Sequence, residues 1–291
     1  MMPKPHVAIL GLGLMGTGMA GRLLSEKFPV TVYNRSREKA EALAADGATV
    51  AGSPREAAAQ ARVVIGMVAD DAASRAVWLG ENGALAGVAP GTVLIESSTL
   101  TPGWVRELAA AASRQKCEFL DAPVTGTKPH AASGELLFLV GGSAQALEAA
   151  RPVLAAMSRD IVHLGPTGSG ATMKLVNNFL CGVQAASFAE AMALVEAGEL
   201  NREQAAKILC NGAPGSPLIR AIWSRVASGD LTPNFVLRLM AKDLKYATEE
   251  AKQRGLALKT AAPAIEVFED AARNGYGDQD FAAVIEAQRR H

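Results

Sequence analysis

A glycine-rich segment near the N-terminus constrains the fold of this chain more than any other feature of the sequence. It reads Gly11-Leu12-Gly13-Leu14-Met15-Gly16. It directly follows the apolar run Val7 to Leu10 and opens a helix-like stretch, Met15 to Leu24. A strand, a GxGxxG turn and a helix in this order are typical of the first βαβ unit of a dinucleotide-binding domain. The segment therefore predicts a parallel sheet that binds a dinucleotide at this turn.

Each glycine of the turn has a physical reason. Gly11 permits the tight turn, Gly13 lets the backbone approach a pyrophosphate, and Gly16 allows close packing of the helix. The N-terminus of the helix then faces the phosphates. The alternative is a strand–helix turn that binds no ligand.

The end of the second predicted strand, Val30 to Tyr33, indicates which dinucleotide binds. An NAD enzyme places Asp or Glu about 20 residues after the glycines, where it holds the ribose hydroxyls. This chain has Asn34-Arg35-Ser36 instead. Arg35 can pair with a 2′-phosphate that an acid would repel, and Asn34 and Ser36 can donate hydrogen bonds to it. We therefore expect NADP(H) to be preferred, with NAD(H) possible. The alternative is a solvated arginine beside a helix cap.

The remaining pattern divides the chain near residue 165. Before that point, apolar runs alternate with helix-like segments, as in an α/β fold with a parallel sheet that can include antiparallel members. The later strands are expected at Val63–Val68, Thr92–Glu96, Phe119–Leu120, Leu136–Val140 and Ile161–Leu164. We predict a Rossmann-type domain over residues 1–165 and an all-α domain over 166–291. A long apolar helix from about Gly170 should join them, with the active site in the cleft between.

Composition narrows the classes of partner. Lys plus Arg and Asp plus Glu both number 29, which argues against nucleic acid or a membrane surface held by bulk charge. Three scattered cysteines and four histidines without ligand spacing predict no disulfide framework and no metal site. Without a signal segment or a run of about 18 apolar residues, the chain is expected to be cytoplasmic. Burial of the long helix suggests a homodimer or homotetramer.

Two residues of the long helix are candidates for chemistry. Lys174 and Asn178 are four residues apart and therefore share one helix face. A lysine in an apolar stretch is costly unless it is paired, lies at a helix end or lines a cleft. From the residues alone, a functional lysine and one that extends its ammonium into solvent remain equally open.

Five blocks in order resemble the β-hydroxyacid dehydrogenase family. They are Gly11 to Gly16, Ser97-Ser98-Thr99, Asp121 to Gly126, Gly168 to Asn178, and Lys242-Asp243. The tripeptide at 34–36 and the segments 235–243 and 277–286 most resemble the glyoxylate/succinic semialdehyde reductase branch. The resemblance runs nearly end to end.

The resemblance implies roles for individual residues. Lys174 matches the family's catalytic lysine, whose ammonium stabilises charge on the carbonyl oxygen and donates the proton. Asn178 would bind the substrate or orient the lysine. Thr125 and Gly126 resemble the loop that binds the substrate carboxylate; the family usually has Ser where this chain has Thr125, so the added methyl can narrow the pocket.

Four further residues are assigned by the same resemblance. Thr99 matches a position beside the nicotinamide ribose, and Lys242 one that reaches the cofactor. Phe235 matches an aromatic near the substrate pocket, and Asp243 would pair locally or help close the cleft. Without the resemblance, Phe235 reads as a core residue and Lys242-Asp243 as a solvated pair.

We therefore expect NADPH-dependent reduction of a small aldehyde acid of the glyoxylate or succinic semialdehyde type. An NAD(P)-dependent dehydrogenase of 3-hydroxyisobutyrate or a related 3-hydroxy acid uses the same residues in reverse. An imine reductase is disfavoured by Lys174, because those relatives typically lack the lysine. A cofactor-binding protein without chemistry is disfavoured by Lys174 together with Asn178.

Overall fold

The computed structural model describes residues 3–289. Its contacts separate two compact units, Met1–Lys174 and Leu175–His291. The separation falls inside helix α8 (Ser169–Ala197), so this one helix begins in the first unit and continues in the second. Each unit is described by itself below.

The first unit is built on a sheet of nine strands among the residues described. Their order is β3-β2-β1-β4-β5-β6-β8-β7, with β9 paired to β8. The strands are β1 (Val7–Leu10), β2 (Val30–Tyr33), β3 (Thr49–Val50), β4 (Val63–Gly66), β5 (Val93–Glu96), β6 (Glu118–Asp121), β7 (Val124–Thr125), β8 (Leu136–Gly142) and β9 (Ser158–Gly165). Strands β1 to β6 run parallel, whereas β8 is antiparallel to β6 and β7.

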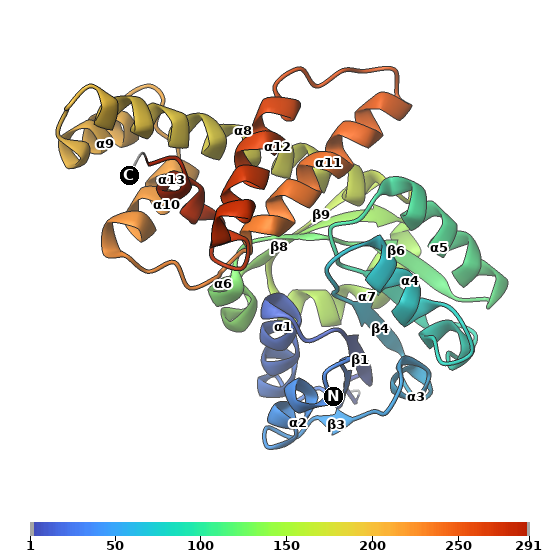
Figure 1. The fold of residues 1–291 in the computed structure, drawn as a ribbon. Coiled ribbons are helices and arrows are strands. Elements are labelled where there is room, and N and C mark those ends of the chain that lie inside the picture. Colours follow the sequence, from blue (N-terminus) through green and yellow to red (C-terminus); the bar gives the residue numbers. More distant parts are fainter. Residues whose placement is uncertain (1–2, 290–291) are drawn as a thin grey trace. The chain divides into compact units, whose positions relative to one another are not determined.

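Helices cover both faces of this sheet (Figure 1). They are α1 (Leu14–Ser25), α2 (Arg37–Ala44), α3 (Pro54–Ala58), α4 (Asp71–Trp78), η1 (Ala84–Ala86), α5 (Pro102–Arg114), α6 (Lys128–Ser133) and α7 (Ala144–Ala156). Alternate residues of β1 enter two separate cores: Ile9 packs with residues of α1 and α7, and Leu10 with residues of α4 and α5. Burial on both faces explains why the strand is continuously apolar. The predicted Rossmann-type sheet is confirmed.

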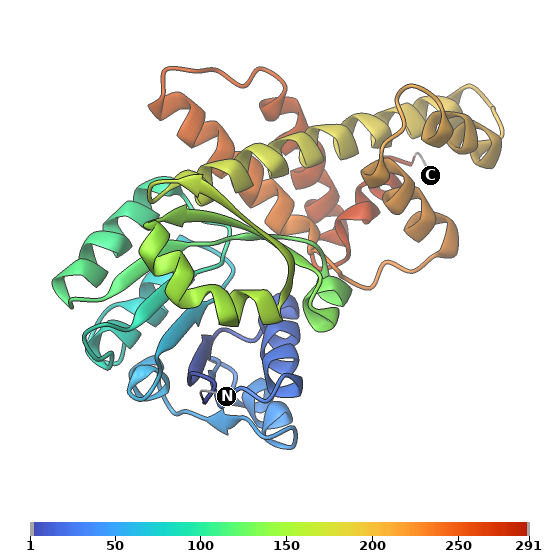
Figure 2. The same ribbon diagram turned by 180° about the vertical axis from the view of Figure 1, so that it is seen from behind.

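The second unit consists of helices in the part that the structure describes (Figure 2). After α8 come α9 (Arg202–Asn211), α10 (Pro217–Ser228), α11 (Leu237–Gln253), α12 (Ala261–Ala271), η2 (Ala272–Tyr276), η3 (Phe281–Ala283) and α13 (Val284–Ala287). Their core gathers Phe188, Leu244 and Phe268. Gly182 lets α8 approach α11, because a Cβ there would lie 2.8 Å from Leu244. The all-α character predicted for this region is confirmed.

Strand positions agree best with the sequence where a strand is a buried apolar run, whereas the longer β8 and β9 extend beyond their predicted bounds. Strands β1 and β2 have the predicted bounds, whereas β4 ends at Gly66, two residues before the predicted end. Strands β3 and β7, of two residues each, were not predicted. Two residues show no periodicity, so only pairing with a neighbour makes them strands.

Helix α8 exposes several large apolar side chains. Val176, Leu180 and Leu194 are 46%, 61% and 74% exposed. By length and composition α8 could cross a membrane, although the core helix of a water-soluble protein meets the same criterion.

Candidate active site

The glycine turn between β1 and α1 has the geometry of a ligand cradle. Gly11 has a φ of +100°, and a Cβ there would lie 2.4 Å from the Met67 carbonyl oxygen. A Cβ on Gly16 would lie 2.0 Å from the carbonyl oxygen of Gly11, so α1 packs against the turn itself. At Gly13, by contrast, an added Cβ would meet no atom within 4 Å. The backbone at Gly13 is therefore open to an incoming group.

The N-terminus of α1 fits a pyrophosphate. Gly13 is its N-cap and offers no side chain, and the first turn contains no acidic residue. The first N–H groups of a helix lack partners within the helix, and its dipole favours an anion. Leu12 is buried and Met15 packs against the same core, so these side chains anchor the turn. Leu14, the first residue of α1, contributes its backbone N–H to this end. The residues present thus fit the phosphates of a dinucleotide.

The three residues after β2 differ in role: Asn34 supports the glycine turn, whereas the side chains of Arg35 and Ser36 are open to a ligand. Asn34 Oδ1 accepts a hydrogen bond from the Leu12 N–H at 2.9 Å, and Asn34 Nδ2 donates to the Ser36 carbonyl at 2.9 Å. Asn34 therefore ties the glycine turn to the end of β2. Arg35 is exposed and forms no ion pair within residues 3–289. The Ser36 hydroxyl makes no capping bond to α2, which leaves both side chains available to a phosphate.

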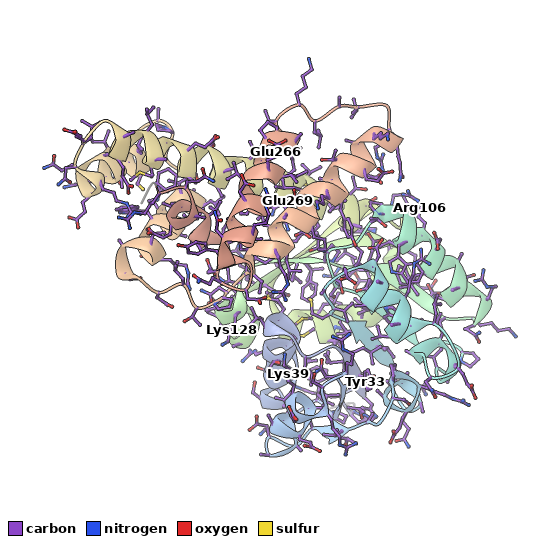
Figure 3. The ribbon with its side chains drawn as sticks, viewed as in Figure 1. Tyr33, Lys39, Arg106, Lys128, Glu266 and Glu269 are labelled. Atoms are coloured by element: carbon purple, nitrogen blue, oxygen red, sulfur yellow. The ribbon has the colours of Figure 1, made fainter. Side chains whose placement is uncertain are left out.

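Figure 3 labels Tyr33, the last residue of β2, and Lys39, which lies in the first turn of α2 after the tripeptide. Lys39 is exposed and follows Arg35 by four residues in the chain. No acidic residue stands at 34–36, where an NAD enzyme would hold the ribose hydroxyls.

The loops that follow β4 and β5 are joined to each other at the carboxyl edge of the sheet. The Val68 N–H donates to Ser98 Oγ at 2.8 Å. Thr99, the residue predicted beside the nicotinamide ribose, follows directly and is half-buried. The turn at Gly11 contacts the same β4 loop, since a Cβ on Gly11 would lie 2.8 Å from Val68 Cγ1.

A buried carboxylate holds the start of α8. Asp121 ends β6 and is fully buried; its Oδ1 accepts the Gly168 N–H and its Oδ2 the Ala171 N–H, both at 2.8 Å. Burial raises the pKa of Asp121, although these N–H groups act in the opposite direction. Lys174 is half-buried three residues after Ala171 on the same helix. Asp121, a family marker without an assigned role in the sequence, thus positions the helix that carries Lys174.

The predicted carboxylate-binding loop lies between β7 and α6. Thr125 is half-buried at the end of β7, and the exposed Gly126 has a φ of +127° that strongly favours glycine. Thr127 follows, and its N–H donates to His130 Nδ1 at 3.2 Å. His130, to which the sequence assigned no role, therefore holds the end of this loop.

In the second unit, Asp243 is the centre of a polar cluster. Only 1% of its side chain is exposed; Lys242 Nζ lies 2.9 Å from its Oδ1, and Asn178 Nδ2 donates to its Oδ2. Asn177 Nδ2 donates to Asn178 Oδ1 at 2.9 Å. Both ends of the Asn178 amide are thus oriented by protein groups. Asn177 is a neighbour that the sequence did not single out.

Two other features of this unit complete the predicted set. Lys242 Nζ lies 4.6 Å from the centre of the Tyr246 ring. Phe235 is half-buried and packs edge-to-face on Phe281, with ring centroids 5.7 Å apart. Within residues 3–289, no group of three or more His, Cys, Asp or Glu side chains is arranged to hold a metal ion.

The predicted residues therefore form two sets. The first unit carries the glycine turn, the 34–36 tripeptide, Thr99, the Thr125-Gly126 loop and Lys174; the second carries Asn178, Phe235, Lys242 and Asp243. Lys174 and Asn178 lie one turn apart on the continuous helix α8.

Two family models together match nearly the whole chain. Residues 6–165 match the model described as the NAD binding domain of 6-phosphogluconate dehydrogenase. Residues 168–288 match the one described as NAD-binding of NADP-dependent 3-hydroxyisobutyrate dehydrogenase. Both halves thus match nicotinamide-dependent oxidoreductases.

Individual relatives are similar over their full lengths. An NAD-dependent L-serine dehydrogenase of Pseudomonas aeruginosa is 38% identical over 286 residues, which cover 96% of each chain. Glyoxylate/succinic semialdehyde reductase 1 of Arabidopsis thaliana is 32% identical, covering 97% of this chain and 98% of that protein. The solved structure of Mycobacterium tuberculosis 3-hydroxyisobutyrate dehydrogenase with L-serine has a TM-score of 0.88 at 32% identity, covering 99% and 100%.

Proposed function

This chain belongs to the β-hydroxyacid dehydrogenase family, and from that premise we propose that it is an NADPH-dependent reductase of small aldehyde acids. It is an oxidoreductase that acts on hydroxyl or aldehyde groups with a nicotinamide dinucleotide. The substrate class proposed is glyoxylate or succinic semialdehyde, and the product is the hydroxy acid. The relative from Arabidopsis thaliana carries both substrates in its name.

The observation that carries the proposal lies at the end of β2. Arg35 is exposed and forms no ion pair within residues 3–289, and the neighbouring Ser36 hydroxyl makes no capping bond to α2. A guanidinium and a hydroxyl suit a 2′-phosphate, whereas the carboxylate of an NAD enzyme would repel it. The bound cofactor supplies the hydride.

Lys174 is proposed as the proton donor. Negative charge develops on the aldehyde oxygen during reduction, and an ammonium close to that oxygen stabilises it and supplies its proton. Asp121 fixes the first turn of α8, so the lysine projects from a held backbone. Thr125 and the backbone at Gly126 are proposed to bind the substrate carboxylate, with Phe235 and Asp243 in the substrate pocket.

A second candidate is the oxidation of a 3-hydroxy acid. The relative named NAD-dependent L-serine dehydrogenase is 38% identical, and the similar solved structure contains L-serine. L-Serine is itself a 3-hydroxy acid, and its oxidation would use the same groups in reverse, with Lys174 accepting the proton.

We also propose that the protein is a cytoplasmic homodimer or homotetramer in which α8 contributes its exposed apolar side chains to the subunit interface.

A rate screen tests the proposal. NADPH and NADH are each offered with glyoxylate, succinic semialdehyde, tartronate semialdehyde, methylmalonate semialdehyde and a cyclic imine, and NAD+ and NADP+ with L-serine and 3-hydroxyisobutyrate. Fastest turnover of NADPH with an aldehyde acid is the expected result. Faster oxidation of a 3-hydroxy acid would replace it with the second candidate, and no turnover at all would indicate a binding protein.

Lys174→Ala tests the proposed chemistry. We expect kcat to fall by about 10²–10⁴-fold, while the Kd for NADPH stays within a few-fold of that of the unmodified protein. Lys252→Ala is the matched control, because Lys252 is exposed in the last turn of α11. Full activity of Lys174→Ala would remove the lysine from the mechanism.

A further inference from the structure

A buried glutamate lies beneath the two loops that border the glycine turn. Glu96 is the last residue of β5 and pairs in register with Gly66, the last residue of β4. Both strands run parallel to β1, so their carboxyl ends meet at the edge where the turn lies. Glu96 is 1% exposed, and no Lys, Arg or His forms an ion pair with it within residues 3–289. A buried acid without a cation is costly, which calls for an explanation.

When it is ionised, the carboxyl group of Glu96 accepts all of its hydrogen bonds. Its Oε2 accepts from Ser74 Oγ at 2.6 Å and from Trp78 Nε1 at 2.7 Å, and its Oε1 accepts the Ser98 N–H at 3.0 Å. Trp104 Nε1 donates to Ser74 Oγ at 2.9 Å, which leaves the Ser74 proton free to point at Glu96. Because an indole N–H and a backbone N–H can only donate, both carboxyl oxygens are required as acceptors.

From Glu96 the bonds continue into the cofactor side of the sheet. The Ser98 backbone is bound to Glu96, and its hydroxyl accepts the Val68 N–H at 2.8 Å. The chain of bonds therefore fixes the β5 loop to the β4 loop. Thr99 is the next residue of the first loop, and Val68 contacts the turn at Gly11. These bonds therefore link the Glu96 carboxyl group to both loops.

We propose that Glu96 is a positioning residue that holds the Ser98-Thr99 and Val68 loops in the conformation that binds the nicotinamide ribose. The position of Thr99 beside the nicotinamide ribose, and the identity of the ligand, are taken from the proposed function, on which this inference therefore rests. Glu96 is buried and so is not open to a ligand; it acts through the Ser98 N–H. Apolar side chains could fill its place at lower cost in desolvation, but they could not bind the two loops together.

Glu96→Gln tests the role because it preserves shape. The amide has one acceptor oxygen, so its NH2 must face either the Trp78 N–H or the Ser98 N–H, and one bond is lost in either orientation. We expect the Kd for NADPH, titrated by fluorescence without substrate, to rise by about tenfold or more. The KM for NADPH should rise with it, whereas kcat at saturating cofactor should change by less than about threefold.

Trp104→Phe is the matched control. Within the network it removes the outermost bond, to Ser74 Oγ. Because Trp104 is also buried and stacks on Arg75, the substitution should lower the melting temperature while leaving the Kd for NADPH within about twofold. An unchanged Kd for folded Glu96→Gln, or an equal loss of affinity in both variants, would overturn the positioning role.

Ser98→Ala decides the question if Glu96→Gln does not fold. It deletes the hydroxyl that accepts the Val68 N–H and keeps the backbone bond to Glu96, so a raised Kd is expected and an unchanged one refutes the inference. The unmodified protein is titrated first. If it binds neither dinucleotide, the proposed function fails; if it binds NADPH and the variants do too, only the role of Glu96 fails.

Discussion

Replacing Asp121 by asparagine probes how α8 is held at its start. In the native chain, each carboxylate oxygen accepts one backbone N–H, from Gly168 and from Ala171. Asparagine offers one acceptor oxygen, so its NH2 must face one of these two N–H groups. The site is fully buried, and water cannot replace the missing acceptor.

The magnitude follows from these two bonds. A hydrogen bond to a charged group contributes about 1.5–3 kcal/mol, and a buried donor left without a partner costs about 1–3 kcal/mol. These terms overlap, so we expect Asp121→Asn to lower the free energy of unfolding by about 2–4 kcal/mol. For a unit of this size that corresponds to a fall in melting temperature of about 4–16 °C.

The assay is urea unfolding followed by circular dichroism, with Asp46→Asn as control because Asp46 is exposed. Activity supplies a second measurement: Lys174 lies three residues beyond Ala171, so kcat should fall more than the affinity for NADPH. A loss of less than about 0.5 kcal/mol, the range of an ordinary surface substitution, would refute the view that Asp121 holds the helix.

Two further predictions concern charge. Arg35→Glu should raise the Kd for NADPH by about 10–100-fold, the worth of a charge-assisted contact, and change that for NADH by less than about threefold; equal changes in titrations of both cofactors would contradict the 2′-phosphate assignment. Burial raises the pKa of Glu96 above its ordinary value, so its contribution to stability is present below the ordinary glutamate range and is lost as pH rises through the raised pKa. The difference in unfolding free energy between the unmodified protein and Glu96→Gln should therefore narrow from acidic to neutral pH, and a difference independent of pH would be the contrary result.

Agreement between sequence and structure depends on how local the determining interactions are. Strands β1 and β2 have their predicted bounds, because each is a run of buried apolar residues whose pattern is visible in the chain itself. Strand β7 was not predicted, since its two residues become a strand only by pairing with β8.

The candidate site shows the same division. The roles of Gly11 and Gly16 can be predicted from the sequence, because the steric constraint that requires glycine at these positions acts within a segment of six residues. The pair Lys242-Asp243 reads as solvated in isolation, yet Asp243 is buried and bound to Asn178, 65 residues away in the chain. A sequence pattern cannot report such a partner, because the fold alone brings it near.

By itself, the sequence determined the alternation of strands and helices, the phosphate-facing turn, the absence of an acid at residues 34–36 and the family. These depend on short-range sterics, periodicity and ordered motifs. Only the tertiary structure decided that Asp121 holds α8 and that Glu96 joins two loops. Both are acids at the ends of buried strands, and their roles arise because parallel pairing and helix packing bring distant N–H groups to one carboxylate and exclude water from it.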